Sequence, residues 1–581
     1  MKGMKIMNKN IIYSVAAAAA TMMLASCESM DITPLSQGNS ESWYSTEVEL
    51  DMAVSEFYIL GYWNQPLEGS EQWTDNFTYR QQNRNPGSNG TVLDGTMNGQ
   101  QWEVYSLWQQ DYKLIARANS LLANYHKAAG NVSESQLNRY AGEAYFCRAC
   151  KYAELICYYG DVPYMEGTET ISEALQKGRR NKDEVKALAY EDFDKAIEYL
   201  PKDYGTSAMH VTKGAALAMK TRFALYLGDF DLAAKAAKDC MDLGIYSLEP
   251  DFAKLFLQDT HINAEKIFYI PRSLENDVIL DAWYVNNGLP RNAGGYGSDN
   301  PSWDLFAAFL CTDGLPIDES DLFDPRNPFK NRDPRCAKTI VEFGTEHCGF
   351  EYNPRPDVKQ VMNFTTGKMQ DNNDNRAVNQ YASYNGLLWK KGIDISWTQN
   401  GKKVARDYVM MRYADVLLMY AEAKIELNEI DKSVVDAINT VRARAYGVKL
   451  TDTTMYPAVP QGNQDEMRKA VRIERRMELA NEGLRYMDLI RWKLAGKALN
   501  GYNYINLPAT DLLNDIVKKD LWFWGMTPQI DEDGIADFSA LYNAGLCALG
   551  AKRVFPDRQY LWPIPTREMT LCPNLTNNPG Y

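Results

Sequence analysis

Residues 187–201 read Ala-Leu-Ala-Tyr-Glu-Asp-Phe-Asp-Lys-Ala-Ile-Glu-Tyr-Leu-Pro, and they indicate the architecture of the chain. Their apolar side chains recur at three- and four-residue steps, which is the period of one helix face. Small alanines alternate with large rings along that face, and Pro201 ends the helix. A second helical pattern covers 212–227, and Gly228-Asp229-Phe230 turns the chain into a third at 232–243. Small residues at packing positions and a terminal proline are typical of tetratricopeptide helix pairs.

The same period appears on both sides of this unit. The further helical segments that it predicts are 48–60, 102–122, 136–159, 410–427, 431–446, 466–482 and 484–497. About four helix pairs result, which is enough to bury a continuous core. We therefore predict a mainly α protein with a minor α+β part: a tetratricopeptide-like solenoid of helix pairs, with long loop-rich insertions.

Loop-rich segments interrupt the helical pattern and set the predicted boundaries. An N-terminal helical region covers 46–244 and includes a polar loop at 61–101 that we expect to contact ligand. A loop-rich insertion follows at 245–405, then C-terminal helix pairs at 406–500, then a second loop-rich segment at 501–581. Loops of this length inside a compact protein usually carry function.

The N-terminus reads as a targeting segment. Three lysines precede an apolar run at 11–20, which is too short for a permanent transmembrane helix. The run leads to Leu24-Ala-Ser-Cys27, which resembles a bacterial lipobox, and in that class Cys27 becomes the lipid-bearing first mature residue. An ordinary cleavage site with a chance cysteine is the alternative. We predict a signal peptide at 1–26 and a lipid-anchored tether at 27–45.

Composition narrows the function classes. The 581 residues carry 62 Lys and Arg against 76 Asp and Glu, a net charge of −14, which argues against bulk nucleic-acid binding. The chain holds 13 Trp and 36 Tyr but only 19 Phe. An excess of rings with a polar group suggests aromatic surface that meets a hydrated ligand.

Neither the cysteine spacing nor an acidic stretch indicates a metal site. Cys147-x2-Cys150 lies in a helical pattern and has no second pair at zinc spacing, so we read buried helical thiols. Cys336 and Cys348 could pair in a loop. Asp371-Asn-Asn-Asp-Asn resembles the start of a calcium loop but lacks the required later Gly and Glu. We expect no metal site and no cofactor.

Four stretches carry a family resemblance. Arg412-Tyr-Ala-Asp-Val-Leu-Leu-Met-Tyr-Ala-Glu-Ala and the following segment 435–445 look like a central helix and its partner. The most specific stretch is 473–492, which contains Ile-Glu-Arg-Arg-x-Glu-Leu and ends in Asp-Leu-x-Arg-Trp. The C-terminus, 561–581, is close to the family ending, with Asn577 where the family has Gln. Together with the lipobox, these stretches resemble the SusD/RagB family of surface lipoproteins.

The resemblance implies a function that periodicity and spacing do not give. Such proteins are tethered to the outer face of the outer membrane and bind oligosaccharides or other nutrients. They act as the lid of a TonB-dependent SusC-like transporter, deliver ligand into its barrel and have no catalytic activity.

The charged segment at 472–491 also allows an enzymatic reading. Glu474 and Glu478 share one helix face, and paired carboxylates carry out glycoside hydrolysis. The neighbouring arginines would hold both carboxylates ionised, whereas a general acid needs the opposite shift. We therefore predict a structural ion-pair network that joins two helices.

Two polar, aromatic stretches are the candidate ligand site. Trp and Tyr present flat faces to the C–H groups of a sugar ring, while Arg, Asn, Gln and Asp bond its hydroxyls. The residues that we predict to contact ligand are Trp73, Asp75, Tyr79, Arg80, Trp102, Trp283, Tyr284, Arg291, Tyr296 and Trp303. The leading hypothesis is a surface glycan-binding lipoprotein that works with a transporter. The alternatives are a lipid-anchored glycoside hydrolase and a helical-repeat scaffold that binds only protein.

Overall fold

The structure is a computed structural model, and it describes residues 43–63, 70–85, 92–205, 210–258, 260 and 263–581. The predicted signal peptide, Cys27 and most of the predicted tether lie outside the described residues. No helix within these ranges is long and apolar enough to cross a bilayer.

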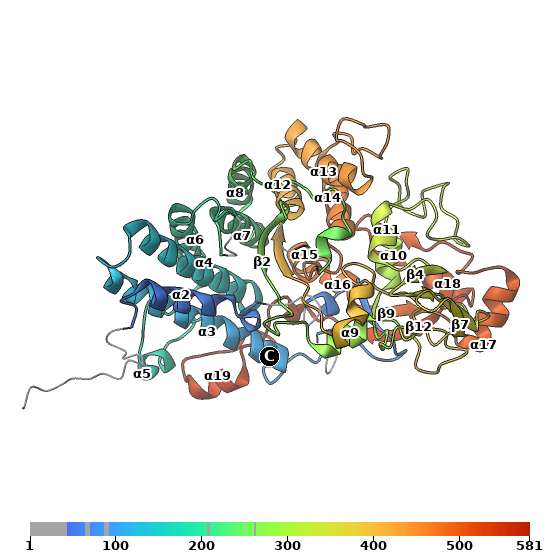
Figure 1. Cartoon of the computed structure of the whole chain (residues 1–581), viewed down its shortest axis with the longest axis horizontal. Coiled ribbons are helices and arrows are strands. Elements are labelled where there is room, and N and C mark those ends of the chain that lie inside the picture. The colour runs from blue at the N-terminus through green and yellow to red at the C-terminus, as the bar shows by residue number, and fades with distance from the viewer. Residues whose placement is uncertain (1–42, 64–69, 86–91, 206–209, 259, 261–262) are drawn as a thin grey trace, which may run out of the picture.

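The chain is mainly helical, as predicted (Figure 1). The longer helices are α2 (Glu47–Ser55), α3 (Trp102–Asn124), α4 (Glu134–Tyr159), α6 (Lys182–Tyr199), α7 (Lys213–Tyr226), α8 (Phe230–Asp242), α12 (Tyr413–Glu426), α13 (Lys432–Ala445) and α14 (Gln464–Leu479). The shorter helices are α5 (Ile171–Leu175), α9 (Ala282–Gly288), α10 (Trp303–Ala308), α11 (Pro334–Thr339), α15 (Arg485–Arg491), α16 (Ala495–Ala498), α17 (Ala509–Asp511), α18 (Ser539–Asn543) and α19 (Thr566–Leu571).

The strands are short and pair locally or across the insertions. They are β1 (Phe77–Tyr79), β2 (Lys266–Ile270), β3 (Asp299–Pro301), β4 (Thr345–His347), β5 (Phe350–Tyr352), β6 (Gln360–Asn363), β7 (Lys368–Asp371), β8 (Tyr408–Arg412), β9 (Gly501–Ile505), β10 (Gln529–Ile530), β11 (Ala536–Asp537) and β12 (Ala548–Arg553). Strands β4 to β7 form one four-stranded antiparallel sheet inside the first insertion.

Local sequence explains where the repeat helices begin and end. The side chain of Asn181 caps α6 by accepting from the Asp183 peptide N–H, and the backbone turns extended at Leu200, just before Pro201. Close helix packing depends on small residues. A Cβ added at Gly214 on α7 would lie 2.0 Å from the Tyr246 hydroxyl, so a larger residue there would displace the Tyr246 ring.

The helical solenoid continues across the first insertion. α8 packs directly on α12, although 170 residues separate them in the sequence, and both contribute to one continuous apolar core. β2 and β8 pair antiparallel where the chain leaves and re-enters the solenoid, with Lys266 opposite Arg412. The predicted interrupted solenoid is therefore confirmed.

Most of the two loop-rich segments forms the other lobe of the molecule, while α19 near the C-terminus lies beside the N-terminal helices (Figure 1). Apolar residues of the two segments share one core, in which Trp389 and Trp397 of the first segment are fully buried with Phe523 and Phe538 of the second. The loops are therefore anchored by a common interior, which gives an irregular backbone fixed positions.

The cysteines that the structure describes are free thiols. Cys336 and Cys348, which could have paired, are both unpaired and buried. Cys147 and Cys150 lie inside α4 as predicted, and burial raises the pKa of both thiols, which makes them poor nucleophiles and poor metal ligands.

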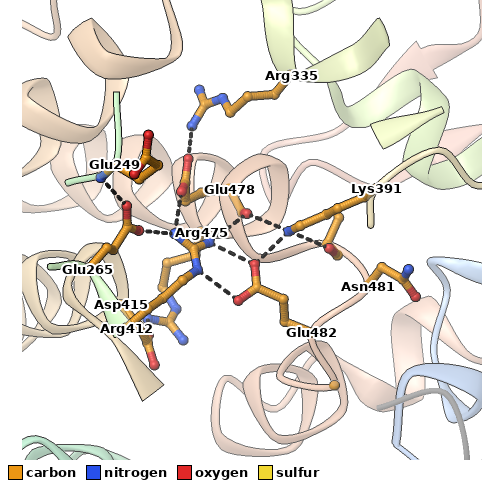
Figure 2. Close-up of polar contacts among 12 residues, drawn as sticks. Glu249, Glu265, Arg335, Lys391, Arg412, Asp415, Arg475, Glu478, Asn481 and Glu482 are labelled. Atoms are coloured by element: carbon orange, nitrogen blue, oxygen red, sulfur yellow. Dashed lines mark hydrogen bonds and ion pairs between the residues drawn. The ribbon is translucent and has the colours of Figure 1, made fainter. Parts of the chain in front are cut away.

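A cluster of buried charges joins α14 to the segments around it (Figure 2). Glu478 on α14 is fully buried and accepts from Arg335 at 3.0 Å and from Arg412 at 2.6 Å. It also accepts from Arg444 on α13. Arg335 belongs to α11 in the first insertion, so one carboxylate binds both lobes of the molecule together.

The neighbouring residues of α14 extend this cluster. Glu474 accepts from Arg335 at 2.7 Å and from Arg442 at 2.9 Å. Arg475 donates to Asp415 on α12 at 2.8 Å and to Asp488 on α15 at 3.2 Å. The predicted structural network is confirmed, and it links more elements than the two helices expected.

Electrostatics keep the carboxylates of this cluster charged. Burial alone would raise the pKa of Glu478, but the guanidiniums of Arg444, Arg412 and Arg335 outweigh it and hold the pKa well below the usual range. Burial opposes ionisation of Asp415 too, and Arg475 and Arg222 lower its pKa. These groups act as fixed anions.

Replacing Glu478 by Gln should strongly destabilise the fold. The change leaves three buried guanidiniums without their shared anion, and breaking a buried pair costs about 3–5 kcal/mol. The free energy of unfolding, measured by urea titration, should fall by that order. The exposed Glu429, which pairs with Lys424, is the matched control, and Glu429→Gln should change little. Equal stability of the two variants would contradict the role given to Glu478.

Stability should also fall in acid. Because the folded chain depresses the pKa of Glu478, its contribution is complete above the unfolded-state pKa of about 4.3 and is lost as the pH falls below that value. The free energy of unfolding of the wild-type chain should therefore decrease between about pH 5 and pH 3. Glu478→Gln should decrease less steeply over that interval, and parallel curves would argue against this source of the acid sensitivity.

Candidate ligand-binding surface

The two predicted aromatic stretches meet in space. β1 and β3 pair antiparallel, so that Tyr79 lies opposite Asp299 and Phe77 lies opposite Pro301. The peptide N–H of Arg80 extends the pairing by donating to the Ser298 carbonyl at 2.9 Å. The sequence predicted both stretches as ligand loops but did not predict that one ladder joins them.

Trp73 and Asp75 are corrections to the predicted site. Trp73 is 7% exposed, and its ring centroid lies 5.5 Å from that of Tyr486 and 5.1 Å from that of Trp562. Asp75 is buried and accepts from Arg485 through both oxygens, at 2.9 and 2.8 Å. Burial would raise the pKa of Asp75, but the adjacent arginines hold it well below its usual range. Both side chains anchor the loop from inside.

Trp303 is a third correction. It is 2% exposed, its ring centroid lies 3.9 Å from that of Phe523 and 4.0 Å from that of Trp524, and its indole N–H donates to the Asn385 carbonyl. With two rings packed against it and its N–H engaged, Trp303 joins the two loop-rich segments and is almost fully buried.

Trp283 and Tyr296 form an exposed aromatic pair. Their side chains are 58% and 42% exposed, and their ring centroids lie 6.0 Å apart at an interplanar angle of 61°. Asp281 caps α9 by accepting from the Trp283 peptide N–H at 2.7 Å. The Tyr296 peptide N–H donates to the Asn286 carbonyl at 2.6 Å, so fixed backbone supports both rings.

Tyr381 is a third exposed ring on this surface, and it is not among the residues predicted from the sequence. It is 56% exposed, and its carbonyl accepts from Arg80 at 2.6 Å and from Arg291 at 2.9 Å. The two guanidiniums also lie 5.9 and 5.7 Å from the Tyr381 ring centroid. Arg80 and Arg291, one from each predicted stretch, thus converge on one residue of a third loop.

A sequence signal for this third loop existed. Residues 376–384 read Arg-Ala-Val-Asn-Gln-Tyr-Ala-Ser-Tyr, which has the same mixture of arginine, amide and tyrosine as the two stretches that were predicted. The preceding calcium-like stretch is structural: Asp374 accepts from the peptide N–H groups of Arg291 and Asn292, at 2.7 and 3.1 Å. It fixes the Arg291 loop against the third loop.

The other predicted residues are distributed more widely. Tyr79 is half-buried, with the Arg84 guanidinium 4.8 Å from its ring centroid, and Tyr284 is half-buried on α9. Trp102 is 65% exposed at the start of α3, beside the C-terminal segment, where the Thr566 peptide N–H donates to the Gly99 carbonyl. The participation of Tyr79, Tyr284 and Trp102 in ligand binding stays a prediction.

The chemistry of this surface is that of binding. It offers exposed ring faces and guanidinium donors, and the carboxylates of the α14 cluster are buried and ionised, as described above. Across the described residues, no group of three or more His, Cys, Asp or Glu side chains is placed to hold a metal ion.

Comparisons with known proteins agree with this picture. Residues 264–581 match the model of the SusD family, and residues 34–225 match a model described as starch-binding associating with outer membrane. A SusD-like protein of Formosa agariphila is 26% identical, over 98% of this chain and 99% of its own length. A SusD-like carbohydrate-binding protein of Bacteroides fragilis has the same fold, with a TM-score of 0.74, 26% identity and coverage of 92% of this chain and 100% of its own.

Trp303→Ala and Trp283→Ala should differ in stability, because Trp303 is a core side chain and Trp283 is a surface side chain. Truncating a buried Trp costs about 3–5 kcal/mol, so Trp303→Ala should lower the free energy of unfolding by that order. Trp283→Ala should leave it nearly unchanged, since that side chain is 58% exposed. Urea titration of both variants measures the difference, and similar losses would contradict the assignment of the two rings.

Proposed function

The chain belongs to the SusD family, and from that membership and its exposed aromatic surface we propose that it captures oligosaccharides at the bacterial outer membrane. It is a binding protein rather than an enzyme. The carbohydrate-binding relative of Bacteroides fragilis supports a sugar as the ligand class.

The observation that carries the proposal is the group of exposed rings made by Trp283, Tyr296 and Tyr381, flanked by Arg80 and Arg291. A sugar stacks its C–H face on such rings, and guanidinium N–H groups donate to its oxygens. A surface site of this kind binds weakly, at about micromolar to millimolar affinity, or roughly −8 to −4 kcal/mol. Weak binding suits a protein that must release its ligand.

The rest of the proposal concerns attachment and delivery. Lipid on Cys27 would anchor the chain, and residues 27–45 would tether it at the cell surface. The chain would act as the lid of a TonB-dependent SusC-like transporter in the outer membrane and pass the oligosaccharide to it. The lipobox-like leader and the match to an outer-membrane-associated model support this part.

The two alternatives make different predictions. A glycoside hydrolase needs a carboxyl group that holds a proton, but Glu478 sits among three guanidiniums that keep it ionised. A scaffold that binds only protein could use the same exposed rings, so ligand binding is the observation that separates it from the proposal. The hydrolase predicts product release from an oligosaccharide panel, and the scaffold predicts no affinity for any glycan.

Trp283→Ala should weaken oligosaccharide binding. An aromatic anchor costs about 2 kcal/mol or more when truncated, which corresponds to a loss of affinity of about tenfold or more. Isothermal titration calorimetry against a panel of oligosaccharides measures this change. Tyr542→Ala is the matched control, because Tyr542 is 43% exposed on α18 and lies outside the aromatic group. Unchanged affinity in Trp283→Ala would remove this surface as the binding site.

A further inference from the structure

Three arginines converge on the loop that carries Tyr381. Arg80 and Arg291 both donate to the Tyr381 carbonyl. Arg376 donates to the carbonyls of Gln380 and Ala382, at 3.0 and 2.9 Å, and stacks on Tyr384 at 3.4 Å from the ring centroid. Three consecutive carbonyls of one exposed turn thus accept from three guanidiniums.

These arginines lack carboxylate partners. Within the described ranges, Arg80, Arg291 and Arg376 form no ion pair with an Asp or Glu, although each bonds backbone carbonyls. Arg84, beside Tyr79, likewise pairs with no carboxylate there. The arginines around α14 differ, since each of Arg335, Arg412 and Arg475 pairs with at least two acidic groups.

The Arg80 guanidinium disfavours the charged form of its neighbours Arg291 and Arg376. Burial lowers the pKa of Arg291, and the Arg80 guanidinium lowers it further, while Asp374 acts in the opposite direction. Burial also lowers the pKa of Arg376, and Arg80 again adds to the effect. Two guanidiniums that bond the same carbonyl oxygen, with no carboxylate bonded to either side chain in the described ranges, would be stabilised by an added anion.

Nearby acidic groups do not fill that role. Asp374 is buried and directs both oxygens at the peptide N–H groups of Arg291 and Asn292, and burial raises its pKa to about 6. Asp299, opposite Tyr79, is buried, and its pKa is raised to about 7. A further cation, Lys402, faces the same region by donating to Asn286 at 2.9 Å. Exposed carboxylates lie near by at Asp281 and Asp371, but among the described residues neither forms an ion pair with Arg80 or Arg291.

We propose that this surface selects acidic oligosaccharides, whose carboxylate or sulfate groups bind between Arg80 and Arg291 while a sugar ring stacks on Tyr381. The inference rests on the proposed glycan-binding function and adds the ligand's charge to it. A guanidinium presents parallel N–H donors that match two oxygens of such an anion. The net charge of −14 does not oppose this, because charges beyond a Debye length of about 8 Å are largely screened.

Matched pairs of oligosaccharides test the charge preference. Oligogalacturonate and its methyl ester differ in carboxylates, while dextran sulfate and dextran oligosaccharides differ in sulfates. Calorimetry should show at least one acidic member binding about tenfold or more tighter than its neutral partner, with affinity that falls as salt rises. The pair that shows the difference distinguishes carboxylate from sulfate.

Variants then assign the preference to the two arginines. Arg291→Gln and Arg80→Gln should each weaken binding of the preferred acidic probe about tenfold and flatten its salt dependence, while Arg291→Lys, which keeps the charge, should lose less. Arg326→Gln is the matched control: Arg326 is exposed on another loop, and its guanidinium donates to the Asp520 carbonyl at 3.0 Å. Thermal unfolding should show that all four variants fold.

The outcomes separate the two proposals. Neutral members binding as tightly as acidic ones, or acidic binding unchanged in both Gln variants, would overturn the charge preference and leave glycan binding intact. Failure of every saccharide in the panel to bind the folded wild-type chain would count against both.

Discussion

The pairing of buried charges around α14 is the constraint on which the rest of the structure depends. An isolated buried ion costs several kcal/mol, so each charge here must find partners, and the partners lie in segments far apart in sequence. Glu478 needs Arg335 from the first insertion and Arg444 from the repeats, and Arg485 needs Asp75 from the N-terminal loop. A misplaced segment would leave a buried charge without its partner. The network therefore fixes how the loop-rich lobe packs against the solenoid.

The buried charges also position the proposed binding surface, because Asp75 lies two residues before β1. Asp75 is fixed by Arg485, and β1 begins two residues later, so the strand that carries Tyr79 starts from a fixed point. β1 then pairs with β3, which follows the Trp283 and Tyr296 loop. The exposed rings are thus held by backbone that the buried charges position, and a rigid platform of this kind loses little entropy when a ligand binds.

The helices could be predicted from the sequence more accurately than the positions of the loop side chains. Apolar periodicity located α6, α7 and α8, because a solenoid helix repeats its burial every three or four residues. Loop residues have no such period. Trp73 and Trp283 occur in equally polar, aromatic surroundings, yet Trp73 is buried because Tyr486 and Trp562, hundreds of residues later, cover it. Composition therefore indicated the region of the proposed site but could not separate its buried side chains from its exposed ones.

Local sequence also cannot distinguish an arginine that pairs with carboxylates from one that does not, whereas the structure can. Arg335 and Arg291 both lie in the loop-rich first insertion, and nothing local in the sequence distinguishes them. In the fold, Arg335 meets three carboxylates, whereas Arg291 meets a backbone carbonyl and a second guanidinium. The first arrangement satisfies its charges internally and stabilises the fold. The second ties the Tyr381 loop to its neighbours and also leaves positive charge beside exposed rings, where the proposed acidic ligand would bind.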